Sequence, residues 1–318
     1  MAYVDFQIPQ GNFAIGVSGG GDSMALVHRV VAAGGRPVVL HYNHQWSAWG
    51  DKAEAFVRAY CKAHKLKLVV GKGRGRAATN AEETARKERY GFFAKQVAKL
   101  GLEGVLVAHT QTDDVEGFFM RLARGSGVKG LSGMAADGVV EGVRVVRPLL
   151  GATREELRAY LKQHKVKYLN DPSNGKGDTF RGRVRKVLPA LAEAGILPQH
   201  VAASMASLRA ADAALEATVQ SLWALHGRVE AGKKGVCAHF PRPVLLGLPE
   251  EVAVRILAVV LRESGQPAPL PRRAQLVGKL QEVRAANAGK VSLGQCAVWW
   301  NATGVGSCVG NLVRSLKK

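Results

Sequence analysis

The chain of 318 residues is 47% hydrophobic and 22% charged, which is typical of a globular protein with room for two domains and excludes a disordered or fibrous chain. No apolar run reaches the length of a membrane span, and the start lacks the pattern of a secretion signal, so we expect a cytoplasmic protein. The four cysteines are scattered without a C-x-x-C pair, which argues against a disulfide framework, a zinc ribbon or a cysteine-ligated cluster.

The charge is strongly unbalanced. Lys and Arg number 45 against 25 Asp and Glu, which gives a formal net charge of +20. Such a charge makes the folded chain repel itself, and a polyanionic partner would offset that repulsion. A generally basic surface would give the same number, so the charge favours a nucleic acid as partner without establishing one.

The first half of the chain alternates short apolar runs with helical patterns. We predict strands at 13–17, 37–41, 66–70, 104–108 and 143–150, and helices between them at 23–33, 53–64, 81–100 and 115–124. This alternation predicts an α/β fold, in which a doubly wound, mostly parallel sheet is covered by helices on both faces.

The pattern changes after residue 150. Helices are predicted at 154–164, about 199–225 and 250–263, with a basic, turn-rich loop at 170–185 and a small β hairpin at 290–309. Gly195 and Pro198 punctuate the chain between these parts. We therefore expect a catalytic domain at residues 1–193 and a smaller, mainly helical domain with a β tail at 194–318.

The most informative segment joins the first strand to the next helix and reads Ser18-Gly19-Gly20-Gly21-Asp22-Ser23. Glycines let backbone N–H groups turn toward a phosphate, and a helix N-terminus adds a positive dipole. Ser18 and Ser23 can donate hydroxyl groups, while Asp22 is suited to hold Mg²⁺ against the phosphates. A turn that only packs helix on strand is the alternative, but the six positions in this context favour an ATP site.

This segment resembles the S-G-G-x-D-S signature of the PP-loop ATP pyrophosphatases, which adenylate a carbonyl group and release pyrophosphate. Later segments occur in the order found in the tRNA(Ile)-lysidine synthetase family, a match that spans most of residues 13–190. These segments are Glu83–Tyr90, His109–Glu116, Arg121–Gly127, Gly130–Met134, Arg147–Leu150, Asp171–Asn174 and Arg181–Arg185.

The resemblance implies a carbon–nitrogen ligase that uses ATP and Mg²⁺. Members of that family adenylate the C2 oxygen of the wobble cytidine in a CAU-anticodon tRNA(Ile). The ε-amine of free L-lysine then displaces AMP, which gives lysidine and changes the codon read from AUG to AUA. By the same resemblance, residues 194–318 would bind the tRNA.

The family's acidic residues that recognise lysine fall in the segment after the fourth predicted strand. The resemblance carries that role to Asp113 and Glu116, whose i, i+3 spacing places them on one helix face. Acids at a helix start also favour the helix dipole without any function. We expect Asp22, Asp113 and Arg86 to be catalytic. Arg86 shares a helix face with Arg89, and an exposed, salt-bridged helix explains that pair equally well.

Four further side chains are expected near the substrates. His109 ends a strand at the carboxyl edge, where doubly wound sheets bind ligands, although a structural histidine would also fit. His44 matches the family's D-H segment, with Asn43 in the aspartate's place, which implies contact with adenosine. Arg181 and Arg183 lie where the family is arginine-rich near substrate, which implies contact with a phosphate or the lysine carboxylate; a solvated surface is the alternative.

The sequence departs from the family pattern at Thr112, in place of the first of two aspartates, and at Gly117 and Gly182. The nearest alternative function is a PP-loop tRNA thiolase, but many thiolases need paired cysteines that this chain lacks. A basic RNA-binding protein with a degenerate ATP site conflicts with the intact Ser18–Ser23 turn. An amidotransferase would need a glutaminase domain, for which no second α/β domain is available.

Overall fold

The computed structural model describes residues 8–75, 81–171, 179–232, 235–266, 270–293 and 296–309. The chain divides into two compact units, one formed by residues 1–126 and 130–206 and the other by 127–129 and 207–318. The division lies inside helix α8 (Pro198–His226), somewhat beyond the change expected near residues 193–198. None of the helices in the described ranges is long and apolar enough to cross a membrane.

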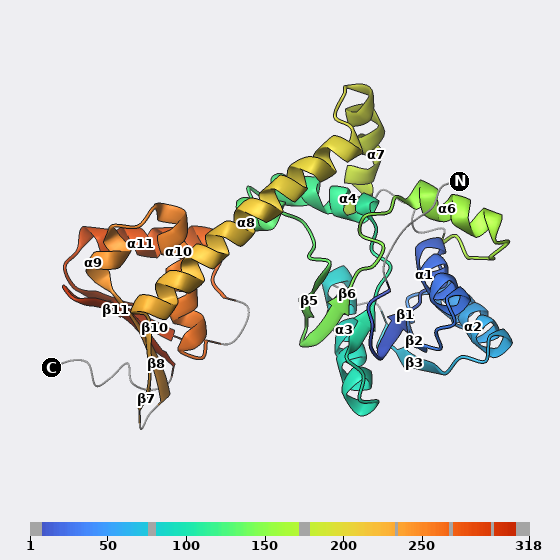
Figure 1. The fold of residues 1–318 in the computed structure, drawn as a ribbon, viewed down its shortest axis with the longest axis horizontal. Coiled ribbons are helices and arrows are strands. Elements are labelled where there is room, and N and C mark those ends of the chain that lie inside the picture. The colour runs from blue at the N-terminus through green and yellow to red at the C-terminus, as the bar shows by residue number, and fades with distance from the viewer. Residues whose placement is uncertain are drawn as a thin grey trace. The chain divides into compact units, whose positions relative to one another are not determined.

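A six-stranded sheet forms the centre of the first unit (Figure 1). All neighbouring strands are parallel except the edge strand β5, which is antiparallel to β6. This confirms the doubly wound, mostly parallel fold. The strands, in spatial order, are β3 (Leu68–Lys72), β2 (Val38–Asn43), β1 (Phe13–Gly16), β4 (Gly104–Leu106), β6 (Val143–Val146) and β5 (Asp137–Val140).

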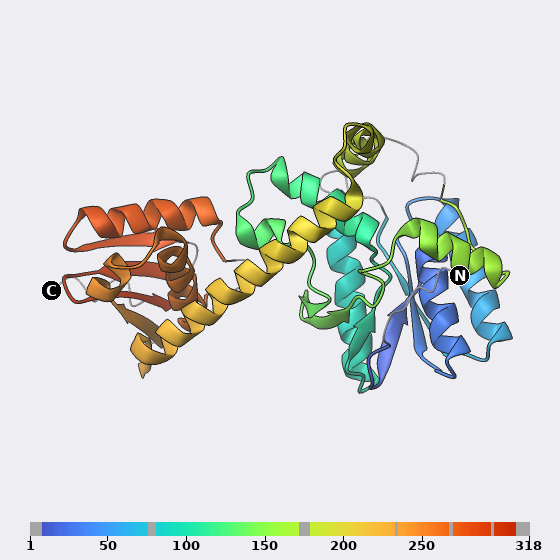
Figure 2. The same ribbon diagram turned by 45° about the horizontal axis from the view of Figure 1, so that its top comes forward.

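Helices cover both faces of this sheet, as the two views of the ribbon show (Figures 1 and 2). Successive residues of a strand point to opposite faces. Ile15 therefore packs with α1 (Gly21–Ala32), α2 (Ala48–Ala63) and α6 (Arg154–Gln163), whereas its neighbour Ala14 packs with Tyr90 and Phe93 of α3 (Ala81–Lys99). Both strand residues are fully buried, which explains the uniformly apolar sequence of β1.

The strand order creates a switch point between β1 and β4. From β1 the chain proceeds through β2 and β3 on one side, and β4 and β6 lie on the other. The carboxyl ends of these two adjacent parallel strands lead into Ser18–Ser23 and His109 respectively. Doubly wound sheets bind ligands in the crevice at this position.

The basic segment after residue 178 is a helix, α7 (Phe180–Glu193), where we expected a loop to continue to residue 185. Thr179 caps its start, because the Thr179 side chain accepts a hydrogen bond from the Gly182 N–H at 3.1 Å. The helix packs against α4 (Gln111–Leu122), and Leu188 contacts a small apolar cluster that includes Val115 and Met205. Tertiary packing and a good cap therefore outweigh the unfavourable Gly182 and Pro189. The expected Asp171–Asn174 segment lies outside the described residues apart from Asp171.

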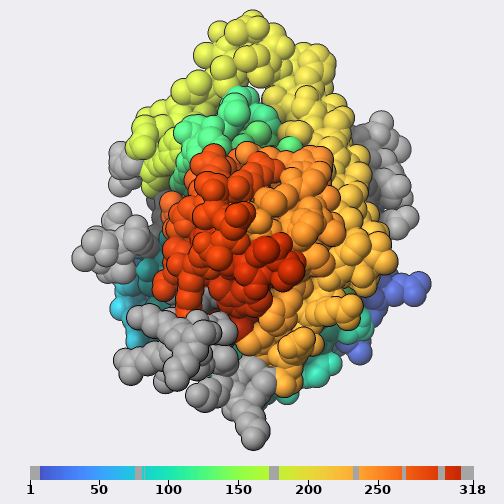
Figure 3. Space-filling model, turned by 90° about the vertical axis from the view of Figure 1, so that its left-hand side faces the viewer, coloured from blue at the N-terminus to red at the C-terminus, as the bar shows by residue number. Residues whose placement is uncertain are grey.

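The second unit contains a five-stranded antiparallel sheet in addition to its helices. We predicted α10 (Glu250–Glu263) and strand structure within residues 290–309 correctly, but not the first two strands or α11 (Arg273–Ala285). The strands, in spatial order, are β7 (Arg228–Gly232), β8 (Gly235–Pro241), β11 (Gly304–Val309), β10 (Cys296–Trp300) and β9 (Gly289–Leu293). Apolar residues of α10 and α11 pack on this sheet, and Figure 3 shows the close packing of the orange and red segments.

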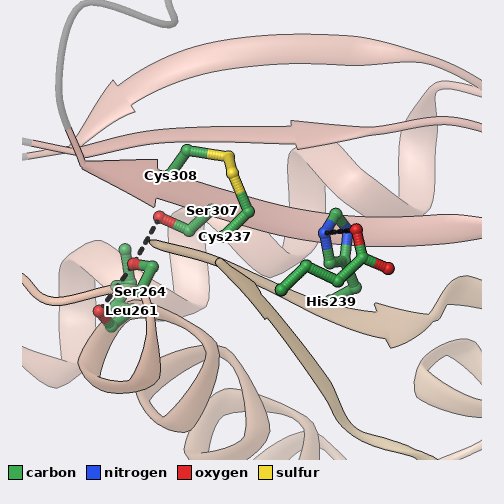
Figure 4. Close-up of a disulfide and its surroundings, with 7 residues drawn as sticks. Cys237, His239, Leu261, Ser264, Ser307 and Cys308 are labelled. Carbon is green, nitrogen blue, oxygen red and sulfur yellow. Dashed lines mark hydrogen bonds and ion pairs between the residues drawn. A yellow bond between two sulfur atoms is a disulfide. The ribbon is translucent and has the colours of Figure 1, made fainter. Parts of the chain in front are cut away.

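A disulfide joins Cys237 of β8 to Cys308 of β11 (Figure 4). The two residues are direct partners in the register of the antiparallel pair, although 71 positions separate them in the sequence. This bridge corrects the expectation that the scattered cysteines argue against disulfides, because the pairing of β8 with β11 brings two distant residues together. Cys61, by contrast, is a buried free thiol in the first unit.

Candidate active site

The glycine turn is held by its own serines. Ser18 Oγ and Ser23 Oγ lie 3.1 Å apart, and Ser23 Oγ donates to the Gly20 carbonyl at 2.9 Å. The Leu169 N–H also donates to the Gly19 carbonyl at 2.9 Å, which ties the turn to the chain beyond α6. These contacts fix the direction in which the strand leads into α1.

Backbone N–H groups at the start of α1 are available for a phosphate. The first backbone bond into this helix runs from Met24 N to Gly20 O at 3.0 Å, so Gly21, Asp22 and Ser23 precede the helical ladder. Their N–H groups point out from the positive end of the helix dipole. We therefore expect a phosphate group to bind at these N–H groups, and this stays a prediction.

Gly19 adopts a φ of +89°, a left-handed conformation that favours glycine. A Cβ at this position would have room, since its nearest neighbour is Val57 Cγ2 at 3.5 Å. We expect Gly19→Ala to lower the free energy of unfolding by about 1–2 kcal/mol through backbone strain alone, measured by urea unfolding. Gly91→Ala, in open space on α3, is the control and should be neutral or stabilising. Equal effects of the two changes would contradict this explanation.

Three acidic side chains converge on one arginine that the sequence analysis did not single out. Arg154, the first residue of α6, lies 3.4 Å from Asp22, 2.5 Å from Asp113 and 2.9 Å from Glu116, measured between guanidinium nitrogen and carboxylate oxygen. Two of these acids come from α4 and the third from α1. The structure thus brings the predicted metal ligand and the two predicted lysine ligands together.

Asp113 is fixed by the start of its own helix. Thr110 caps α4 in a reciprocal arrangement, in which Asp113 N donates to Thr110 Oγ1 and both Thr110 N and Oγ1 donate to Asp113 Oδ2 at 2.9 Å. Burial by itself raises the pKa of the Asp113 carboxyl. The Arg154 guanidinium and the Thr110 bonds outweigh burial and hold that pKa below its usual value, so Asp113 is ionised.

Asp22 is less enclosed than Asp113. Its side chain is 29% exposed, and it forms a long ion pair with Arg154, at 3.4 Å. Burial raises the pKa of Asp22 and the nearby Asp113 carboxylate adds to this effect, while Arg154 opposes it. A cation bound at Asp22 would therefore relieve repulsion between two carboxylates.

Glu116 is fully buried and surrounded by guanidinium groups. Besides Arg154, it pairs with Arg181 Nε at 3.1 Å and with Arg185 Nε at 2.7 Å. Both carboxylate oxygens are therefore taken by arginines, which does not favour the predicted direct contact between Glu116 and a lysine amine. We assign to Glu116 the anchoring of α7 and of Arg154.

Of the two predicted arginines of α7, Arg181 pairs with Glu116 of the acid cluster. Arg181 and Arg185 are four residues apart and share a helix face, whereas the guanidinium of Arg183 lies 5.8 Å from the Phe180 ring centroid. A helix predicted over residues 180–193 would have indicated Arg185, because the i, i+4 spacing places it on the same face as Arg181.

The departures from the family pattern have local explanations. Thr112 Oγ1 accepts the backbone N–H of Arg154 at 3.4 Å, so this threonine contacts the start of α6. At Gly117, an added Cβ would lie 2.9 Å from Arg121 Nη1, because Arg121 reaches back to Asp114 at 3.6 Å. Asp114 itself accepts the Met134 N–H and supports the loop after α5 (Val128–Leu131).

His109 lies near Asp113 and several arginines. Its Nδ1 accepts a hydrogen bond from Arg147 Nε at 3.2 Å, so the neutral ring carries its proton on Nε2 and can donate from there. Burial lowers the pKa of His109 to about 4, and Arg147, Arg89 and Arg86 act in the same direction. Arg86 is exposed and stacks over the Tyr90 ring at 4.8 Å.

The low pKa of His109 predicts a pH dependence of stability. Between about 4 and the ordinary value of roughly 6.5, the unfolded chain binds a proton that the folded chain excludes, so stability falls as the pH is lowered through this range. We expect the urea midpoint to fall less from pH 7 to pH 5 in His109→Asn than in the wild type. His64→Asn, at an exposed position, is the control and should keep the wild-type dependence. The prediction fails if His109→Asn also keeps the wild-type fall of the urea midpoint between pH 7 and pH 5.

His44 and His41 lie where β2 ends. Burial lowers the pKa of His44 to about 4, and its ring lies 5.4 Å from that of Trp46. His41 Nδ1 donates to the Val17 carbonyl at 2.8 Å, next to the glycine turn, so its Nε2 is an acceptor. That Nε2 and His44 Nδ1 are buried without a hydrogen-bond partner among the described residues, which fits contact with a polar ligand. Asn43 is instead held by Asp51 of α2 at 2.9 Å.

This glycine turn, at the switch point of a doubly wound sheet, defines a PP-loop nucleotide-binding protein, and the PP-loop domain family matches residues 3–191. The tRNA(Ile)-lysidine synthase of Novosphingobium aromaticivorans is 34% identical over 286 residues, covering 87% of this chain and 83% of the relative. That of Bradyrhizobium diazoefficiens is 32% identical, with 89% and 80% covered. The chain belongs to the tRNA(Ile)-lysidine synthase family of PP-loop proteins.

Other comparisons define the extent of the similarity. The tRNA(Ile)-lysidine synthase of Anaplasma marginale is 32% identical over 82% of this chain, but the match covers 57% of that longer relative. Among solved structures, the U34-tRNA thiolase NcsA from Methanococcus maripaludis has a TM-score of 0.53 over 63% of this chain and 73% of its own. At 14% identity this second similarity is one of fold alone.

Proposed function

We propose that the protein uses ATP to join free L-lysine to C2 of the wobble cytidine in a CAU-anticodon tRNA(Ile), giving lysidine, AMP and pyrophosphate. The carrying observation is the convergence of Asp22 and Asp113, from two different helices, beside the phosphate-binding turn. Asp113 caps α4 with Oδ2, and its Oδ1 lies on the side of Arg154 and Asp22, where it could also meet a substrate amine. The membership of the family supports the same reaction.

The residues divide between two chemical steps. In the first, the cytidine C2 oxygen attacks the α-phosphorus of ATP and the bond to pyrophosphate breaks; the N–H groups of Gly21, Asp22 and Ser23 would bind the departing phosphates. In the second, the lysine amine attacks C2, loses a proton, and AMP leaves with the C2 oxygen. Asp113 would orient the amine, and the Nε2–H of His109 would donate to the oxygen.

The arginines and the remaining ATP contacts follow from their positions. Arg86, exposed beside His109, would meet the negative charge of the adenylate, and Arg181 and Arg183 would meet tRNA phosphate or the lysine carboxylate. His44, with the acceptor atom of His41, would contact the adenosine.

A magnesium ion would be held by Asp22. No group of three His, Cys, Asp or Glu side chains in the described residues forms a metal cage, which suits Mg²⁺, since this ion is usually bound by one or two carboxylates together with substrate phosphates. The partly exposed Asp22 carboxylate beside the turn provides such a ligand. When bound, the ion neutralises phosphate charge.

The deciding experiment is incubation of the chain with ATP, labelled lysine and CAU-anticodon tRNA. We expect label in the tRNA together with stoichiometric pyrophosphate and AMP. Pyrophosphate without labelled tRNA would eliminate the ligase and leave ATP cleavage. Transfer of sulfur in place of lysine would support a thiolase. The buried free thiol of Cys61, the one cysteine in the sequence of the first unit, argues against that reaction.

We propose further that residues 194–318 bind the tRNA and that the protein acts in the cytoplasm. With a net charge of +20, binding should be driven by phosphate contacts that release counterions. We expect the affinity for CAU-anticodon tRNA to fall at least tenfold between 50 and 200 mM KCl, measured by filter binding. A flat salt dependence would contradict this mode of binding.

A further inference from the structure

Arg154 takes the position at which an external cation would have to bind. It contacts acids from α1 and α4 at once, and its side chain is only 19% exposed. Its backbone is fixed, because Thr153 caps α6 through a reciprocal pair with Glu156 and Arg154 N donates to Thr112 Oγ1. Only the side chain of Arg154 is therefore free to leave the acids.

The hydrogen-bond pattern leaves one route to Asp113. Asp113 Oδ2 is used by the two donors of Thr110, and Asp113 Oδ1 is used by Arg154 Nη2. Neighbouring Glu116 has no exposed surface, and its oxygens are shared by arginines. An ammonium group that approaches Asp113 therefore meets Oδ1, where it competes with Arg154 Nη2 for the same carboxylate oxygen.

The charges of the cluster also favour exchange over addition. Asp22, Asp113 and Glu116 face three guanidinium groups, those of Arg154, Arg181 and Arg185. A further cation beside an unmoved Arg154 would meet like-charge repulsion in a partly buried site. If Arg154 moves away, the incoming cation restores the balance.

A partner for the displaced guanidinium is close at hand. Arg154 Nε is 3.4 Å from Asp22, which lies in the first turn of the helix that we expect to bind phosphates. A planar guanidinium fork binds phosphate oxygens with two parallel bonds. Binding of ATP would thus draw Arg154 toward the phosphates and vacate Asp113 Oδ1.

We propose that Arg154 is an exchangeable cation that makes lysine binding depend on ATP. This proposal rests on the proposed function, because it names the order in which the two substrates enter the same site. Arg154 is a positioning residue here. It pairs with the acids until the nucleotide is bound, and it then leaves Asp113, which becomes accessible to the lysine amine. The result is positive coupling between the two binding events.

Calorimetry of the full chain with L-lysine tests this directly, with and without a non-hydrolysable ATP analogue and Mg²⁺. For the wild type we expect lysine to bind at least about tenfold more tightly with the analogue. In Arg154→Gln, lysine should bind without the analogue at least about tenfold more tightly than in the wild type, and the analogue should add less than about threefold. Arg154→Lys, which keeps the charge without the fork, should retain part of the coupling.

The matched control is Lys162→Gln, about two turns further along α6 and exposed, which should keep wild-type coupling. Thermal unfolding checks that each variant is folded. If Arg154→Gln does not fold, the reduced coupling expected of Arg154→Lys becomes the test. Wild-type coupling in a folded Arg154→Gln, or an unchanged affinity for lysine alone, overturns the proposal. If the wild type makes lysidine, unchanged lysine binding in Arg154→Gln overturns only the proposed exchange of Arg154 for lysine. If the wild type makes no lysidine, the proposed function fails as well.

Discussion

Replacement of Asp22 by Asn is expected to slow pyrophosphate release by about a thousandfold, equivalent to about 4 kcal/mol of transition-state stabilisation. The change keeps the size of the side chain but removes the charge that would hold Mg²⁺ beside the glycine turn. Arg154 would also lose one of its three acidic partners. The measurement is the initial rate of pyrophosphate release with saturating ATP, lysine and tRNA.

The control for Asp22→Asn is Asp137→Asn, at an exposed aspartate of β5 that pairs with Arg144 at 2.6 Å. This surface pair lies outside the acid cluster, so the rate should remain within about twofold of the wild type. Titration with Mg²⁺ separates two causes of a slow Asp22 variant: a weakened metal site is partly rescued at high Mg²⁺, whereas a damaged turn is not. Turnover at the wild-type rate would remove Asp22 from the proposed metal site.

The largest loss of stability is expected at Glu116. Its buried carboxylate balances guanidinium groups from α6 and α7, and Glu116→Ala leaves them beside one another without it. Removal of one partner from a buried ion pair costs about 3–5 kcal/mol. Since the three arginines are partly exposed and can turn toward water, we expect about 3 kcal/mol for the unfolding of the first unit.

Urea unfolding followed by circular dichroism measures the effect of Glu116→Ala. The comparison is Glu83→Ala, which removes an exposed i, i+4 pair with Lys87 and should cost no more than about 0.5 kcal/mol. A loss below about 1 kcal/mol in Glu116→Ala would mean that the arginines do not depend on this carboxylate, contrary to the anchoring that we assign to it.

The fold of the first unit was predictable where hydrophobic pattern and burial agree. β1 and β4 are buried on both faces, so their apolar runs are unambiguous. β5 was missed because a two-residue turn at Glu141 and Gly142, with φ values of +46° and +79°, joins it to β6. A glutamate rarely adopts this conformation, so the sequence lacks the usual Asn-Gly signal of such a hairpin.

The second unit was harder to predict for a different reason. Strand β8 pairs with β11, about 70 residues later in the sequence, and the edge strand β7 carries the exposed polar residues Arg228 and Glu230. Local patterns identify a helix such as α10, whose apolar residues recur every three or four positions, but they do not identify long-range strand partners.

The candidate site shows a similar division between local and long-range information. The glycine turn was identifiable because consecutive residues carry the chemistry, and Asp113 was identifiable from the family's segment that this sequence resembles. Arg154 and Arg185 were not, because their roles depend on which acids the fold brings within reach from other helices. A helix that begins at Arg154 was predicted, but its first side chain is also consistent with an ordinary solvated arginine.

The capping arrangement at the start of α4 has a consequence for how this enzyme can change. The two oxygens of Asp113 serve separate purposes, since Oδ2 closes the helix start with Thr110 and Oδ1 faces Arg154. One side chain therefore supports both the start of α4 and the ion pair with Arg154. A longer glutamate would place its oxygens beyond the cap, and a small residue would forfeit both contacts. The surrounding arginines can be substituted one at a time. A substitution of Asp113, by contrast, changes the contact with Arg154 and the start of α4 at once.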